Sequence, residues 1–247
     1  MLSAFWLNTA TKFFLLCIIS YGTGNLVFYK DVKVNYTRKI NHFAMFIIPM
    51  GLDRILPYGR SIESFMLSAV LTVGILIIYI QPVRSRVHII RRMFLSFDRP
   101  EDRPYTLKWL STQILAGYLV LVPAIVLFFE LGYNTLVFIP VLINGFGDGL
   151  AEPVGIRFGK HTYRTTALFS KRTYERSLEG SACVFIASIV ILFVFQASFS
   201  KAEFTCALLV LPMAMTLAEA FSPHTWDTPF LFLTGYTVLY FIKTIPF

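Results

Sequence analysis

Long apolar segments constrain this 247-residue chain more than any other feature. A helix needs about 20 apolar residues, or as few as about 17, to cross the hydrocarbon core of a bilayer. Segments near that length recur along the whole sequence, at 5–28, 42–56, 62–80, 110–129, 136–151, 182–199, 204–221 and 230–245. The segments at 42–56 and 136–151 are the shortest. The sequence therefore predicts an all-α, polytopic integral membrane protein with about eight transmembrane helices.

Composition supports this class of protein. Hydrophobic residues make up 56% of the chain and charged residues 15%, with a mean hydropathy of +0.65. Such a chain has too few polar side chains to cover a water-soluble surface, whereas a bilayer requires no polar cover. No repeat or separate soluble domain stands out, so we expect residues 1–247 to form a single membrane-embedded domain.

A formal net charge of +8 is compatible with nucleic-acid binding or with a membrane protein, and the distribution of the basic residues distinguishes the two. Most Lys and Arg residues lie at 30–39, 84–108 and 157–176, between predicted helices. In an eight-helix topology these three segments share one side of the membrane, which the positive-inside rule assigns to the cytoplasm. We therefore expect no nucleic-acid partner, a bacterial plasma membrane as the location, and contacts between segment 84–108 and anionic lipid head groups.

Segment 144–181 departs most clearly from the apolar background. Asn144, Asp148 and Glu152 recur every four residues and form one helical stripe, and ionisable groups in a membrane helix are costly and usually functional. The glycines between them allow either another helix or a ligand to come close. Pro153 is expected to kink or unwind the helix beside Asp148, and irregular backbone at membrane depth must line a cavity.

The segment that follows is suited to a polyphosphate. Gly155 and Gly159 free the backbone, and cations suited to phosphate oxygens follow at Lys160, Lys171, Arg172 and Arg176. The carboxylates of Asp148, Glu152 and Glu179 suit Mg²⁺, which uses one or two carboxylates together with phosphate oxygens and water. Ser177 and Ser181 lie where the next helix begins, and a helix N-terminus favours anions. The GxxxxGK[ST] pattern is absent, which excludes an ordinary P-loop domain.

Two blocks of this segment carry a resemblance to a known family. Asp148, Ala151, Gly155, Gly159 and Lys160, followed by RSLEGS at 176–181, resemble the GDxxAxxxGxxxGK and KSxEGS blocks of the CTP-dependent lipid kinases. These are the phytol and farnesol kinases, dolichol kinase and the yeast-type diacylglycerol kinase, a family related to the phosphatidate cytidylyltransferases. The family's RKxxH block resembles Arg38, Lys39 and His42, and its terminal E…DN…P block resembles Glu219 and Asp227. Arg176 stands in place of the usual Lys, and Thr228 in place of Asn.

The resemblance implies a catalytic domain that transfers the γ-phosphoryl group of a nucleoside triphosphate, expected to be CTP, to a membrane lipid alcohol. The alcohol would be an isoprenoid such as phytol or a polyprenol, or diacylglycerol. Mg²⁺ is expected at Asp148 and Glu179, and the triphosphate at Lys160, Lys171, Arg172 and Arg176. Asp227 or Glu152 is expected to orient or deprotonate the hydroxyl. The predicted topology places all these residues at the cytoplasmic face, together with Arg38, Lys39, His42, Asn144 and Glu219.

Two alternatives stay open. A phosphatidate cytidylyltransferase would attack the α-phosphate of CTP and release pyrophosphate, but the K-D…H-G-G ending of that branch does not follow Lys171 and Arg172. A lipid transporter or scramblase would carry broken helices at matching positions of internal repeats, and the sequence contains one such interruption. Donors other than CTP also stay open.

Overall fold

A computed structural model describes residues 2–59, 61–168 and 172–246 of the chain, and 79% of it is helical. The chain divides into two compact units, Met1–Thr112 and Gln113–Phe247, which are described separately. The expectation that the whole chain is one catalytic domain stays a prediction. The high helical content agrees with the predicted all-α membrane protein.

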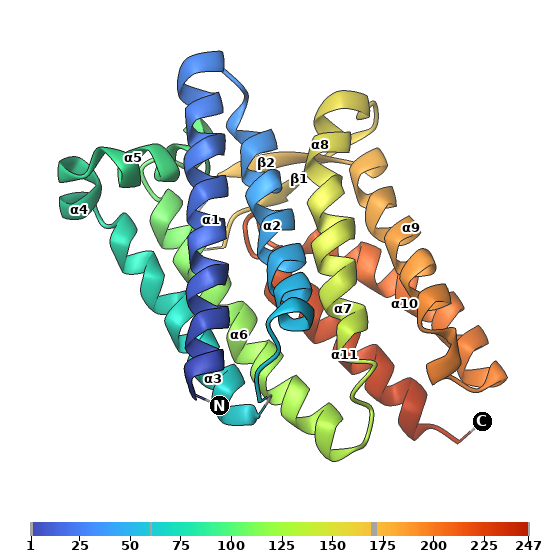
Figure 1. Ribbon diagram of the computed structural model, residues 1–247. Helices are drawn as coiled ribbons and strands as arrows, with labels where there is room; N and C mark the ends of the chain where they lie inside the picture. Colours follow the sequence, from blue (N-terminus) through green and yellow to red (C-terminus); the bar gives the residue numbers. More distant parts are fainter. Residues whose placement is uncertain (1, 60, 169–171, 247) are drawn as a thin grey trace. The chain divides into compact units, whose positions relative to one another are not determined.

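The first unit is built around its first helix. Helix α1 packs along both α2 and α5 (Figure 1). Two buried hydrogen bonds join α1 to α2: Ser20 Oγ donates to Asn41 Oδ1 over 2.7 Å, and Asn41 Nδ2 donates to Thr23 Oγ1 over 2.9 Å. The unit contains α1 (Leu2–Lys30), α2 (Val34–Ile55), α3 (Ile62–Gly74), α4 (Gln81–Arg86), α5 (His88–Leu95) and the start of α6 (Thr106–Glu130).

A charged pair also joins α1 to α2. Lys12 lies within the apolar sequence of α1, and its Nζ is 2.5 Å from Asp53 Oδ1 near the end of α2. Asn8 Nδ2 donates to the same carboxylate oxygen over 3.2 Å. A charge removed from water is costly without a partner, so this pair explains how α1 accommodates a lysine.

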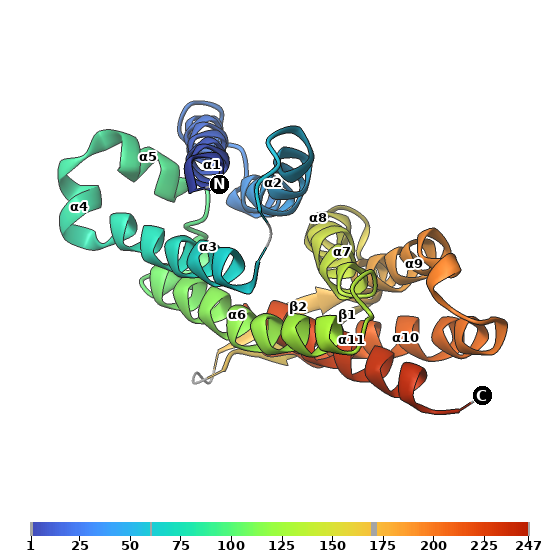
Figure 2. The same ribbon diagram turned by 60° about the horizontal axis from the view of Figure 1, so that its bottom comes forward.

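The second unit packs its helices around an apolar core. It contains the rest of α6, α7 (Phe138–Leu142), a π-helical segment (Ile143–Asp148), α8 (Gly149–Phe158), β1 (Thr162–Thr166), β2 (Thr173–Ser177), α9 (Leu178–Val194), α10 (Lys201–Phe221) and α11 (Asp227–Thr244). Helix α10 packs against both α9 and α11 (Figure 2). Ile139, Val184, Leu211 and Leu231 are fully buried between these elements.

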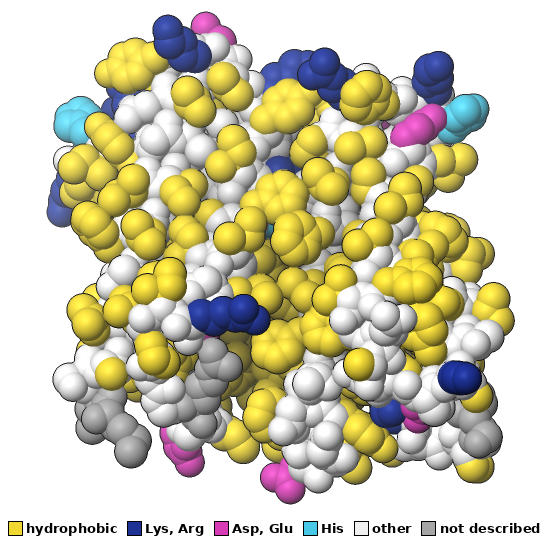
Figure 3. All heavy atoms as spheres, turned by 45° about the vertical axis from the view of Figure 1, so that its right-hand side comes forward, with side chains coloured by type: hydrophobic (Ala, Val, Ile, Leu, Met, Phe, Trp, Pro, Cys, Tyr) yellow, Lys and Arg dark blue, Asp and Glu magenta, His cyan; other side chains and the backbone are white. Residues whose placement is uncertain are grey.

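Four helices are long and apolar enough to cross a membrane, among the residues that the structure describes: Ser3–Lys30, Ile62–Tyr79, Thr106–Glu130 and Lys201–Phe221. In the most apolar 18-residue stretch of Thr106–Glu130, 11% of the residues are buried within the protein. Large apolar side chains such as Leu119 and Leu209 are exposed. Hydrophobic side chains are likewise spread over the face shown in Figure 3. Exposed apolar surface on this scale fits a lipid environment. A helix lies at each of the eight predicted segments, but eight membrane spans stay a prediction.

The helix around Pro153 differs from the expectation. The sequence predicted a break there, whereas α8 continues through Pro153 to Phe158. The departure from α-helical geometry comes earlier, in the π-helical segment that ends at Asp148. A π turn takes more residues than an α turn, and such turns often occur at functional sites. Because Gly149, four residues before the proline, directly follows this wider turn, the helix accommodates the ring without breaking.

A hairpin replaces the loop expected after α8. Strands β1 and β2 pair antiparallel, with Thr162 opposite Ser177 and Thr166 opposite Thr173. The Thr and Tyr residues of TYRTT and TYERS suit a pleated strand, and burial alternates along both strands, so the hairpin has one more deeply buried face. The basic residues of this segment obscured these strand-forming residues in the sequence.

Small residues explain how closely α8 and α9 pack. A Cβ atom built on Gly180 of α9 would lie 2.6 Å from the Ala151 carbonyl oxygen. One built on Gly147 would lie 3.0 Å from Val184 Cα, and one on Gly155 would lie 2.9 Å from Ser177 Oγ. The spacing of four residues between 147, 151 and 155 therefore forms a helix contact surface.

We expect Gly180→Ala to destabilise the protein by about 1–3 kcal/mol, because its methyl group would displace backbone atoms of α8. Gly22→Ala is the matched control. It also lies in a helix, but a Cβ there meets no atom within 4 Å, so stability should stay equal or rise by up to about 1 kcal/mol. Thermal unfolding in detergent measures both effects. Equal unfolding midpoints for the two variants would contradict the close contact.

Candidate active site

One face of the hairpin is directed at the turn between α10 and α11. Side chains alternate along a strand, and Tyr163 lies opposite Arg176 while Thr165 lies opposite Tyr174. The neighbouring residues Arg164 and Glu175 are exposed. The hairpin thus has an inner face, which carries Tyr163, Thr165 and Arg176, and an exposed outer face.

Three contacts hold the hairpin on this turn. Thr165 Oγ1 donates to the Ser222 carbonyl oxygen over 3.1 Å, and the His224 amide donates to the Thr166 carbonyl oxygen over 2.9 Å. The ring of Tyr174 stacks on the His224 ring with 3.4 Å between centroids. These contacts fix the position of the next inward residue of β2, Arg176.

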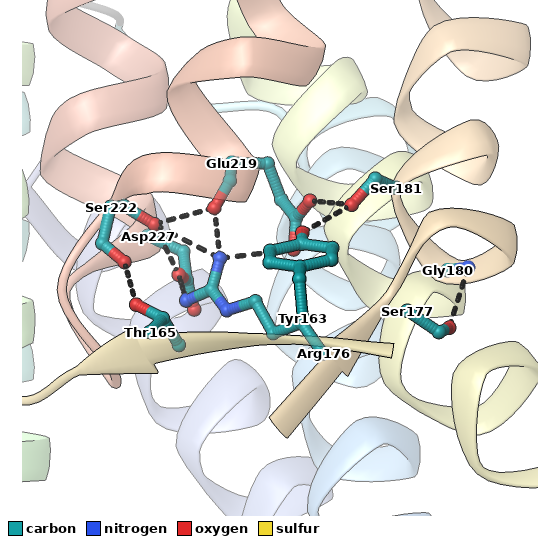
Figure 4. A network of polar contacts seen from close by, with 9 residues as sticks. All are labelled: Tyr163, Thr165, Arg176, Ser177, Gly180, Ser181, Glu219, Ser222 and Asp227. Carbon is teal, nitrogen blue, oxygen red and sulfur yellow. Dashed lines mark hydrogen bonds and ion pairs between the residues drawn. The ribbon is translucent and has the colours of Figure 1, made fainter. Parts of the chain in front are cut away.

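The Arg176 guanidinium connects two carboxylates (Figure 4). Its Nη1 lies 3.1 Å from Glu219 Oε1 and also donates to Ser222 Oγ over 3.2 Å, and its Nη2 donates to Asp227 Oδ1. Ser222 Oγ donates to the same Asp227 oxygen over 2.6 Å. The side chains of Arg176, Glu219 and Asp227 are at most 12% exposed. This arrangement pairs the buried charges and connects β2 to α10 and α11.

The second oxygen of Glu219 belongs to another branch of the network. Ser181 Oγ donates to Glu219 Oε2 over 2.7 Å, and the Tyr163 hydroxyl lies 2.7 Å from Ser181 Oγ. Burial, together with the nearby Glu219 carboxylate, raises the pKa of the Tyr163 phenol. Tyr163 therefore stays protonated at neutral pH, and α9 is tied to the same cluster.

Asp148 lies near this cluster. Burial alone would lower the pKa of the Arg176 guanidinium, but the carboxylates of Asp227 and Glu219, and to a smaller extent Asp148, raise it above its ordinary value. Asp148 is 5% exposed. One turn earlier on the same predicted stripe, Asn144 is fully buried and donates to Thr228 Oγ1 over 3.3 Å. The structure thus brings Asp148, Arg176, Glu219 and Asp227 together from four separate elements.

Glu179, the other predicted Mg²⁺ ligand, contacts His161. Its Oε1 lies 2.9 Å from His161 Nδ1, and the His161 backbone amide lies 3.3 Å away. These hydrogen bonds lower the pKa of the Glu179 carboxyl to about 2, so it is ionised at neutral pH. Glu152 is half-buried on α8. Among the described residues, no group of three or more His, Cys, Asp or Glu side chains is arranged to hold a metal ion.

The predicted phosphate-binding residues fall into two sets. Lys160 and Arg172 are exposed, whereas Lys171 lies outside the described residues. Ser177 caps α9 by accepting from the Gly180 amide over 3.1 Å, and both Gly155 and Gly159 pack closely against this serine. The two glycines therefore have a packing role, and their contact with phosphate stays a prediction.

Arg38, Lys39 and His42 lie on α2 in the first unit. Lys39 is buried, and Arg38 and His42 are half-buried. Their predicted convergence with the residues of the second unit stays a prediction.

Four residues of the network were missed by the sequence analysis. They are Tyr163, Thr165, Tyr174 and Ser222, and His224, which stacks on Tyr174, was missed as well. The Thr and Tyr residues on each side of residues 167–172 are the sequence signal that indicates a hairpin, because both residue types are frequent in strands. Ser222 gave no signal, because a serine that follows a helix is common.

We expect Arg176→Met to lower the free energy of unfolding by about 3–5 kcal/mol, because it leaves the Glu219 and Asp227 carboxylates buried without their cation. The control is Arg164→Met, which removes an exposed arginine from β1 and should change stability by less than about 0.5 kcal/mol. Thermal unfolding in detergent measures both variants. A loss no larger for Arg176→Met than for the control would contradict the buried ion network.

Comparison with known proteins gives one partial similarity. The chain is 33% identical over 93 residues to a protein named phytol kinase from Synechocystis sp., a match that covers 38% of this chain. The match spans 36% of that relative's length. No protein-family model matches the chain, and no solved structure matches it. The comparison therefore relates part of the chain to a lipid kinase.

Proposed function

We propose that this protein is a membrane lipid kinase that transfers the γ-phosphoryl group of a nucleoside triphosphate, CTP in the first instance, to the hydroxyl of a membrane lipid alcohol. The observation that carries the proposal is the buried cluster of Arg176, Glu219 and Asp227 with Asp148 nearby. Ionisable groups buried among apolar helices are costly and mark functional sites. The partial similarity to a phytol kinase supports the reaction class.

Phosphoryl transfer depends mainly on positioning and on neutralising the charge of the transferring group. We assign Lys160 and Arg172, both exposed, to the triphosphate, together with Lys171 and Arg176. Arg176 also holds Asp227 in place, and Asp227 or Glu152 orients or deprotonates the acceptor hydroxyl. The acceptor, an isoprenoid alcohol or diacylglycerol, enters from the bilayer at the cytoplasmic leaflet.

Mg²⁺ fits the donor chemistry of this site. Carboxylate oxygens suit Mg²⁺, and one or two of them are sufficient where phosphate oxygens and water complete the shell. Asp148 and Glu179 would hold the ion, which would neutralise phosphate charge during transfer.

The kinase is tested by the fate of labelled CTP. With phytol and Mg²⁺ present, label from the γ-phosphate should enter the lipid fraction, while label from the α-phosphate should stay in water, because a kinase releases CDP. Lipid labelled from the α-phosphate of CTP, with phosphatidate as acceptor and release of pyrophosphate, would replace the kinase with a cytidylyltransferase. Absence of label from the lipid, with nucleotides and alcohols varied, would reject both enzymes.

We expect Asp148→Asn to lower phosphoryl transfer at least about 100-fold without unfolding the protein, since removing one charge from a transfer site costs several kcal/mol while burial becomes easier. Glu130→Gln is the control, because Glu130 is an exposed carboxylate at the end of α6 and its loss should leave the rate unchanged. Initial rates at saturating Mg²⁺ and thermal unfolding measure the two effects. Near-normal turnover of Asp148→Asn would remove Asp148 from the site.

A further inference from the structure

A second polar contact lies among the apolar helices of the second unit. Gln113 is half-buried on α6, and its Nε2 donates to Thr228 Oγ1 over 3.2 Å. Asn144 Nδ2 donates to the same oxygen over 3.3 Å. One turn further along α6, Gly117 lets Thr228 pack closely, since a Cβ there would lie 3.3 Å from Thr228 Cγ2. Residues of α6, of the π-helical segment and of α11 therefore meet at Thr228.

The hydrogen-bonding capacity of this contact is only partly used. A threonine hydroxyl has one proton to donate, and because Thr228 Oγ1 accepts from both amides, its own proton is directed elsewhere. Among the described residues, the structure gives that proton no acceptor and gives Gln113 Oε1 no donor. The Thr228 hydroxyl proton is thus an unused donor and Gln113 Oε1 an unused acceptor. The two are close because the Gln113 amide itself donates to the Thr228 oxygen.

This pair matches the chemistry of an alcohol. A hydroxyl group donates one hydrogen bond and accepts others, so it can donate to Gln113 Oε1 and accept from the Thr228 hydroxyl. A phosphodiester or a carboxylate has no proton to donate at neutral pH and would leave Gln113 Oε1 without a partner. Unpaired polar groups away from water are costly, so a site of this kind selects strongly for a hydroxyl.

The position of the pair suits a lipid alcohol. Gln113 lies seven residues after α6 begins at Thr106, about 10 Å along the helix axis. Gln113 faces Thr228 of α11, and on the other side of the same helix Leu115 and Leu119 are 48% and 68% exposed, so α6 borders lipid at the level of Gln113. Thr228 directly follows Asp227, whose carboxylate accepts from Arg176. A hydroxyl bound here would keep its chain in the bilayer and its oxygen beside the charged cluster.

The geometry points to Gln113 and Thr228 as the residues that bind the acceptor hydroxyl and select alcohols. This inference rests on the proposed lipid kinase, and it names the residues that would recognise that enzyme's acceptor. Gln113 would accept the hydroxyl proton, Thr228 would donate to the hydroxyl oxygen, and Asn144 would hold Thr228 in orientation.

The test compares binding of phytol with binding of its methyl ether, which accepts hydrogen bonds but donates none. Equilibrium binding to the detergent-purified protein is measured with both ligands. The wild type should bind phytol about tenfold more tightly than the ether, and Gln113→Leu should bind the two equally. Thr228→Val should weaken phytol binding about tenfold, whereas Thr228→Ser keeps the hydroxyl and should bind phytol as the wild type does.

Thr112→Val is the matched control on α6, because the Thr112 hydroxyl bonds only to carbonyl oxygens of its own helix. It should keep the preference for phytol. A wild type that does not distinguish the ligands, or a Gln113→Leu protein that still does, would overturn the inference. If Gln113→Leu does not fold, the comparison of Thr228→Val with Thr228→Ser tests the inference. Equal phytol affinity in these two variants would overturn it. Since phosphoryl transfer is measured separately, an intact preference without kinase activity would reject only the proposed function.

Discussion

The pairing of Arg176 with Glu219 and Asp227 determines how the second unit is assembled. Charges placed among apolar helices must find partners, because their removal from water costs several kcal/mol each. The guanidinium has enough donors to reach two carboxylates and a serine at once. Because each buried charge needs a partner, the contacts of Arg176 fix the geometry of the cluster. This one side chain positions β2, α10 and α11 relative to one another.

The small residues of α8 and α9 have a complementary role. In an apolar environment helices associate through van der Waals packing as well as hydrogen bonds, and small side chains let their backbones come close. Gly147, Ala151 and Gly155 let α9 approach, and Ser181 of α9 then reaches Glu219. A glycine-rich motif that suggests ligand binding in the sequence here also creates the contact on which the polar cluster depends.

The sequence predicted the helices well because each depends on local hydropathy. It also identified Asp148, Arg176, Glu219 and Asp227 as candidate site residues. It did not predict that Arg176 pairs with Glu219 and Asp227, which lie 43 and 51 residues later in the chain, since partners at that separation follow from tertiary packing. The hairpin was missed because its basic residues suggested a phosphate-binding loop. The π turn was missed because Pro153 predicted irregular backbone at its own position, whereas the irregular turn lies earlier, at Ile143–Asp148.

The arrangement of polarity within the second unit has a chemical consequence. Exposed cations lie beside the strands of the hairpin, at Lys160 between α8 and β1 and at Arg172 directly before β2, whereas the inner side of the hairpin meets buried carboxylates. Thr228 links the carboxylate side to Gln113, which lies on a helix whose apolar side chains are exposed. In the proposed kinase, a water-soluble anion and a lipid hydroxyl would therefore approach the same cluster from different surroundings. Meeting at a boundary of this kind is what a transfer reaction between such substrates requires.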